Sequence, residues 1–210
     1  MKILSVSGHG ERDVIRAAID ILLSGGIVAY PTETFYAIGA KFDVPDALRR
    51  VCELKERPRD KALPLIIGDA SLLPSLCPRV SDAADRLAET FWPGPVTLVV
   101  PAREGLSDYL TAGTGTVAVR VPGDSLALRL ARAARFPITS TSANISGRPP
   151  ADDAETVTRY FDRRLDLVID GGRTPGGLPS TIVDVTGERP KLLREGAVRW
   201  DNMAAFILPG

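Results

Sequence analysis

Apolar residues at helical spacing alternate along this chain with short runs of apolar, mostly β-branched residues, and this alternation restricts its possible folds. Expected helices cover residues 12–23, 43–57, 81–92, 126–134 and 152–161, and expected strands cover 27–30, 63–67, 96–100, 117–121, 167–169, 181–185 and 191–193. Some strands follow one another without a helix between them, whereas a purely parallel sheet needs a crossover after each strand. The pattern predicts an α/β (α+β) fold in which helices pack around a twisted sheet of mixed parallel and antiparallel strands.

Length and composition are those of an ordinary globular chain. The 210 residues predict one domain over 1–210, with a core over about 10–200. A Gly/Pro-rich loop at 171–179 is the one long flexible candidate, and its flanks read as strands of the same sheet. The first residues lack a signal pattern and no apolar run approaches membrane-spanning length, so we expect a soluble cytoplasmic protein without a membrane partner.

Several classes of chemistry are excluded by the residue inventory. The 26 basic residues balance 26 acidic ones, so any affinity for phosphates must come from a local patch. His9 is the only histidine, and Cys52 and Cys77 lie far apart, which argues against a histidine triad, a zinc site and a redox motif. Phosphate-loop, dinucleotide-binding and nucleophile-elbow motifs are missing as well.

The segment ITSTSANISG, residues 138–147, carries hydroxyl and amide side chains directly after an apolar stretch. One interpretation is a buried strand that surfaces at its carboxyl end and opens into a polar rim, where ligands bind in open α/β sheets. The alternative is a Ser/Thr-rich turn that caps the next helix. On this segment alone, both remain open.

A cation-rich turn, KERPRDK at 55–61, ends the second expected helix. Because Pro58 stops the helix, Arg59 and Lys61 lie on a turn and could converge with Lys55 and Arg57 on a polyphosphate. The alternative is a solvated helix end whose cations compensate the helix dipole.

Polar side chains also follow the first expected strand, in AYPTETFYAIGA at 29–40, where Gly39 permits a close approach or a positive φ. Arg120 lies inside the otherwise apolar strand TVAVRVP, and Arg194 ends the strand of KLLREG. A buried arginine needs an ion-pair partner or an anionic ligand. Taken singly, each is better explained by a structural ion pair.

Together these segments resemble the YrdC/Sua5 family of threonylcarbamoyl-AMP synthases. The matching motifs occur in the family's order and are PTETFYAIG at 31–39, KERP at 55–58, WPGPVTLV at 92–99, VAVRVP at 117–122, TSANISG at 141–147, STIVD at 180–184 and LREGAV at 193–198. The chain ends soon after the last motif and so resembles the family's short form.

The resemblance implies a concave, locally positive face that binds ATP and L-threonine. The implied reaction joins threonine, bicarbonate or CO₂ and ATP into L-threonylcarbamoyladenylate and pyrophosphate, for the t6A modification of tRNA at position 37. Transferred to matching positions, the triphosphate would be held by Lys55, Arg57 and Lys61, the rest of the nucleotide by Thr116, Ser142, Asn144 and Arg194, and threonine by Thr34, Arg120, Ser140 and Ser180. No covalent nucleophile is expected, and Lys55 and Arg57 would stabilise charge.

The resemblance further implies Mg²⁺ bound through ATP phosphates, with no protein metal site, and a t6A transferase complex that receives the product. At two positions expected near the substrates, the sequence departs from the pattern of the family. Ile66 stands where some relatives have a histidine, and Pro150 stands where some have a hydroxyl. Two other functions remain open: an RNA-binding module in tRNA or ribosome maturation, with weak RNA affinity, and a carbamoyl-adenylating module that does not use threonine.

Overall fold

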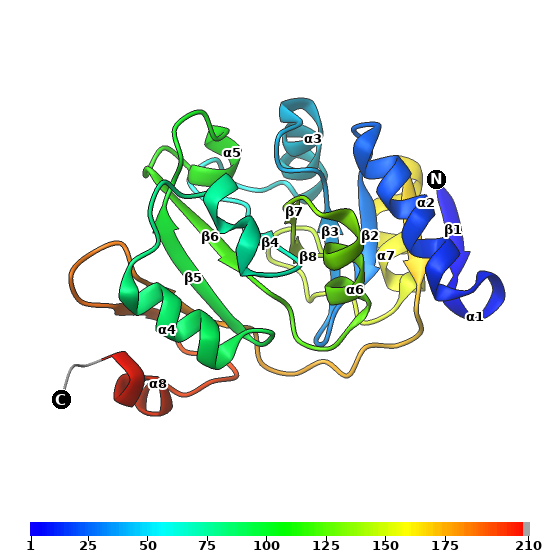
Figure 1. Cartoon of the computed structure of the whole chain (residues 1–210). Coiled ribbons are helices and arrows are strands. Elements are labelled where there is room, and N and C mark those ends of the chain that lie inside the picture. Colours follow the sequence, from blue (N-terminus) through cyan, green and yellow to red (C-terminus); the bar gives the residue numbers. More distant parts are fainter. Residues whose placement is uncertain (208–210) are drawn as a thin grey trace.

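Two mixed sheets form the framework of the protein in a computed structural model that describes residues 1–207 (Figure 1). The five-stranded sheet has the order β1-β9-β2-β3-β8, and the six-stranded sheet has the order β11-β10-β5-β6-β4-β7. Both contain parallel and antiparallel pairs. The strands are β1 Lys2–Ser5, β2 Val28–Pro31, β3 Tyr36–Gly39, β4 Leu65–Ile66, β5 Val96–Pro101, β6 Thr116–Arg120, β7 Ile138–Thr139, β8 Thr141–Ser142, β9 Leu167–Asp170, β10 Thr181–Asp184 and β11 Lys191–Arg194.

Helices cover the sheets on their outer sides. In the five-stranded sheet, α2 and α6 pack against each other and against β2, and α7 packs against β9. Beside the six-stranded sheet, α4 packs against β5 and α8, while α3 contacts α5 (Figure 1). The helices are α1 Val6–His9, α2 Glu11–Leu23, α3 Pro45–Lys55, α4 Asp82–Phe91, α5 Asp108–Thr111, α6 Leu126–Ala134, α7 Ala154–Phe161 and α8 Trp200–Ile207, with 3₁₀ turns η1 Ala70–Ser75 and η2 Asp162–Arg164.

The predicted helices are confirmed, and their ends follow local chemistry. Ser81 and Asp153 accept hydrogen bonds from Ala84 N (3.3 Å) and Thr156 N (2.7 Å), which caps α4 and α7. Pro45 occupies the first turn of α3, and Glu56 closes that helix in the left-handed conformation. The cation-rich turn therefore begins where α3 ends.

The predicted fold class is confirmed. The expectation that the strands on either side of the 171–179 loop belong to one sheet is wrong. The loop joins β9 of the five-stranded sheet to β10 of the six-stranded sheet. Strand β3 also lies within a segment expected to be a loop, and it forms an antiparallel hairpin with β2. Gly39 serves close packing there, since a Cβ atom would lie 2.7 Å from the Tyr30 ring.

The segment 138–147 connects the two sheets. Its buried residues Ile138 and Thr139 form β7 in the six-stranded sheet, and Thr141 and Ser142 form β8 in the five-stranded sheet. Ser140 lies between them, and its N–H donates to Pro64 O (2.8 Å). The predicted strand that opens into a polar rim is thus two short strands of different sheets.

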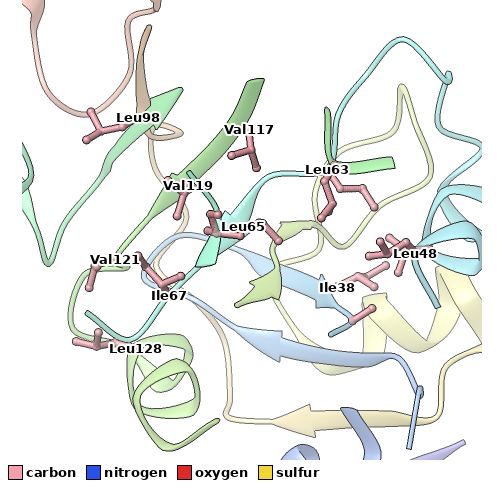
Figure 2. Packing of buried hydrophobic residues seen from close by; sticks show 14 of the residues in the cluster. Ile38, Leu48, Leu63, Leu65, Ile67, Leu98, Val117, Val119, Val121 and Leu128 are labelled. Atoms are coloured by element: carbon pink, nitrogen blue, oxygen red, sulfur yellow. The ribbon is translucent and has the colours of Figure 1, made fainter. Parts of the chain in front are cut away.

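The main hydrophobic core contains residues of both sheets and of helices α3, α4 and α7, with Leu128 from α6. Figure 2 shows side chains from β3, α3, β4, β5, β6 and α6 that point toward one another. A second core packs α2 and α6 against the five-stranded sheet. Within residues 1–207, no helix is both long and apolar enough to cross a bilayer.

Candidate functional site

A cavity of about 350 Å³ lies between the two sheets. Strands β3 and β8 supply one wall and strands β4, β5, β6 and β10 supply the other. The cation-rich turn and the end of the 171–179 loop complete the lining with Arg57 and Pro179. Because the 138–147 segment crosses from one sheet to the other at this point, its hydroxyls face the space between them.

The structure brings most of the predicted site residues to this cavity. All four residues expected around threonine line it, namely Thr34, Arg120, Ser140 and Ser180. Three of the residues expected around ATP do so as well, namely Arg57, Ser142 and Arg194. Residues that are about 150 positions apart in the sequence therefore share one hollow.

Four residues expected to bind ATP do not line the cavity: Lys55, Lys61, Thr116 and Asn144. Thr116 lies on the same face of β6 as Ala118 and Arg120, which both line the cavity, but its hydroxyl pairs with that of Thr114 (2.8 Å). Lys61 is exposed at the end of the cation-rich turn. Their contact with ATP stays a prediction.

Lys55 is fully buried beneath the rim and holds the loop after β8. Its Nζ donates to Ser142 O, to Asn144 O (2.8 Å) and to Asn144 Oδ1 (3.2 Å). Burial and, to a smaller extent, the neighbouring Arg57 lower its pKa from 10.5 to about 7. In this structure Lys55 organises the polar rim that carries Ser142.

Arg57 reaches the cavity while it fastens its own turn. Its Nε donates to Lys61 O (2.9 Å) and its Nη2 to Ala62 O (2.7 Å). Burial lowers the pKa of the guanidinium. These hydrogen bonds fix the orientation of the Arg57 guanidinium, so that it is preorganised to bind an oxyanion.

Arg194, at the end of β11, lies at the opposite side of the mouth against β10. Its Nη2 and Nε donate to Ser180 O at 2.8 and 3.2 Å. Partial burial and then the charge of Arg120 lower the pKa of Arg194. A guanidinium that is partly dehydrated next to another cation is stabilised by a bound anion.

Arg120 has a carboxylate partner, Glu33, which lies in the loop between β2 and β3. Its Nη1 donates to Glu33 Oε1 in a close ion pair, and both side chains are largely buried. The ion-pair interpretation of this arginine is therefore confirmed. Since Arg120 also lines the cavity, the two interpretations are compatible.

Sequence reasoning pointed to the polar segment that contains Thr32 but missed Thr97, and both residues line the cavity. The Thr97 hydroxyl lies 2.8 Å from Ser180 Oγ, and Thr32 Oγ1 accepts from Thr34 N (3.1 Å). Thr97 could have been found as the one polar residue in the apolar run 96–100. Ile66 also forms part of the wall, so that surface is apolar, whereas Pro150 lies outside the lining.

The donor set favours anion binding over direct metal binding. Among the lining residues there are three arginines and several hydroxyls, and none carries a carboxylate. Among residues 1–207, no three His, Cys, Asp or Glu side chains gather in a metal-binding group. The cavity can hold an anionic chain between arginines, cradle an alcohol and stabilise negative charge.

Comparisons with known proteins agree with this arrangement. A family model described as telomere recombination, of the Sua5/YciO/YrdC type, matches residues 20–196. A threonylcarbamoyl-AMP synthase of Pyrococcus abyssi is 40% identical over 205 residues, which cover 98% of this chain and 60% of that protein. One from Escherichia coli O9:H4 is 41% identical over 193 residues, which cover 89% of this chain and 97% of that protein.

A solved structure supports the same assignment. The crystal structure of P. abyssi Sua5 complexed with L-threonine matches with a TM-score of 0.90 at 37% identity, over 99% of this chain and 61% of that chain. This chain thus spans about three fifths of the length of the Pyrococcus relatives. The sequence motifs, the two-sheet fold and these matches together show that the chain belongs to the Sua5/YciO/YrdC family.

Proposed function

We propose that this protein is a threonylcarbamoyl-AMP synthase, which makes L-threonylcarbamoyladenylate and pyrophosphate from L-threonine, bicarbonate and ATP. The observation that carries the proposal is the shared cavity, in which hydroxyls from both sheets stand beside three arginines. Relatives named for this activity cover nearly the whole chain, and a family structure is titled as a complex with L-threonine.

The reaction needs positioning and charge stabilisation more than a protein nucleophile. The neutral threonine amine attacks bicarbonate with loss of water, or CO₂ with loss of a proton, to give a carbamate. A carbamate oxygen then attacks the α-phosphorus of ATP as pyrophosphate leaves. Arg57 and Arg194, which both line the cavity, would compensate the charge that develops on the leaving pyrophosphate. Holding both substrates in one cavity makes the second attack effectively intramolecular.

Mg²⁺ would enter with ATP. Since the cavity lining offers hydroxyls and arginines but no carboxylate, phosphate oxygens and water would supply most of the metal ligands. The ion would neutralise part of the triphosphate charge. The chain's own contribution is the arginine contacts to the remaining oxygens.

The product would pass to a t6A transferase complex, since an acyl adenylate hydrolyses unless it is consumed. We place this chemistry in the cytoplasm, where tRNA is modified. Both statements follow from the proposed reaction.

Pyrophosphate release tests the proposal. Purified protein with ATP, Mg²⁺ and bicarbonate is expected to release pyrophosphate only when L-threonine is present. Release without threonine would favour a carbamoyl-adenylating module that uses another acceptor. RNA retention without any pyrophosphate release would favour an RNA-binding module and would refute the synthase.

A further inference from the structure

The Glu33–Arg120 pair leaves one carboxylate oxygen without a partner. Glu33 Oε1 accepts from Arg120, whereas Oε2 is buried and has no hydrogen-bond partner among the described residues. The two side chains are 19% and 13% exposed. A buried carboxylate oxygen that lacks a donor is costly, so this atom points to a donor that a ligand would bring.

The charge around the cavity is unevenly distributed. Arg57 donates to two backbone carbonyls and Arg194 to the carbonyl and hydroxyl of Ser180, so neither charge is neutralised by these contacts. Arg120 alone pairs with a carboxylate. Of the three arginines that line the cavity, Arg57 and Arg194 therefore offer charges for an anionic chain, whereas Arg120 is paired with Glu33, which is not itself a lining residue.

A zwitterion complements such a pair. In an α-amino acid the carboxylate and the ammonium are attached to the same carbon, so a carboxylate on the free edge of Arg120 places the ammonium within a few ångströms of Glu33. Reaching Oε2 requires only rotation about the last torsion of the Glu33 side chain, which is soft in glutamate.

We propose that Glu33 is a specificity-determining residue that selects an amino acid over a plain carboxylic acid at the threonine position. It neutralises Arg120, so that an anion without an amine gains little there, and its Oε2 accepts a hydrogen bond from the substrate ammonium. This inference rests on the proposed synthase function, since it assumes that the carboxylate on Arg120 belongs to threonine.

The binding of two ligands to the wild type and three variants tests the inference. L-threonine and 3-hydroxybutyrate share the carboxylate and the β-hydroxyl, and only threonine carries the amine. Isothermal titration without ATP gives the Kd of each ligand for the wild type, for Glu33→Gln and for Glu104→Gln. The last replaces an exposed glutamate outside the cavity lining and serves as the matched control.

Wild type and Glu104→Gln are expected to bind threonine at least tenfold more tightly than 3-hydroxybutyrate. Glu33→Gln is expected to weaken threonine at least tenfold and to leave 3-hydroxybutyrate unchanged or tighter, because its site becomes cationic. Glu33→Asp keeps the charge and is expected to keep the preference for threonine.

Other outcomes overturn the inference in distinguishable ways. If Glu33→Gln weakens the binding of both ligands equally, Glu33 only supports the fold. If it tightens the binding of both ligands, Glu33 only competes with the ligand carboxylate for Arg120. If Glu33→Gln does not fold, the other proteins still test the inference. It is overturned if the wild type binds threonine and 3-hydroxybutyrate equally well, or if Glu33→Asp no longer prefers threonine. Wild type that does not bind threonine refutes the proposed function itself, and the inference with it.

Discussion

Replacing Lys55 by methionine separates support of the rim from direct contact with ATP. Methionine keeps the length and apolar stem of lysine but removes the ammonium. Of the three oxygens that Nζ contacts, Asn144 Oδ1 keeps the Ser142 hydroxyl as donor (2.6 Å) and Ser142 O keeps Asn144 N (2.9 Å). Among the described residues, no second donor reaches Asn144 O.

The expected loss of stability follows from that count. One acceptor left without a donor costs about 1–3 kcal/mol, and the two weakened contacts add to it, so we expect a loss of about 2–3 kcal/mol. In a chain of this size, this corresponds to a melting temperature lower by about 5–10 °C. Thermal unfolding followed by circular dichroism measures the shift.

The exposed Lys61 provides the matched control. Lys61→Met is expected to change stability by no more than about 0.5 kcal/mol, although it would raise the KM for ATP if Lys61 binds the triphosphate. If Lys55→Met melts like the wild type and yet loses turnover, Lys55 acts on the substrate and our account of the rim is wrong.

Further predictions concern the cavity and pH. Arg57→Ala and Arg120→Ala are each expected to lower turnover at least tenfold while the protein stays folded, because one charge-assisted contact is worth about 1.5–3 kcal/mol. Near-wild-type pyrophosphate release by either variant would refute the role of the arginine that it replaces. Ser142→Ala is expected to raise the KM for ATP several-fold, since Ser142 lines the cavity, and an unchanged KM in steady-state assays would contradict its role. Folding lowers the pKa of Lys55 to about 7, so above that pH the unfolded chain binds more protons than the folded protein. The stability of the wild type relative to Lys55→Met is therefore expected to rise between pH ~7 and pH ~9, by at most ~1.4 kcal/mol per pH unit. Urea unfolding of both proteins at pH ~7 and pH ~9 measures this difference in stability. A difference that does not change with pH would mean that the oxygen acceptors keep the Lys55 ammonium charged.

Periodicity predicted α2, α3, α4, α6 and α7 because their signals are local, whereas α1, α5 and α8 were not predicted. Residues 126–134 form α6 as expected, since most of its apolar side chains pack into the second core and Leu128 packs into the main core. Sheet membership depends on pairings between distant segments, which no local pattern contains. The segment 138–147 reads as one strand because nothing in its residues marks Ser140 as the crossing point between two sheets.

The candidate site was predictable where residue chemistry matched position. Hydroxyls after a buried strand and arginines in apolar strands pointed to the cavity residues Ser142, Arg120 and Arg194. The burial of Lys55 was not predictable, because a cation at a helix end is usually solvated, and only the path of the loop after β8 places carbonyl oxygens around it. The partner of Arg120 likewise could not be read from sequence, since Glu33 is 87 positions away.

The claim on which the account depends is that threonine and the triphosphate occupy the same hollow between the two sheets. A crystal structure of this protein with L-threonine and a non-hydrolysable ATP analogue tests it most directly. We predict that the threonine carboxylate lies against Arg120 and that the triphosphate lies against Arg57 and Arg194. Density for either ligand outside this cavity, with the cavity itself empty, would contradict the account.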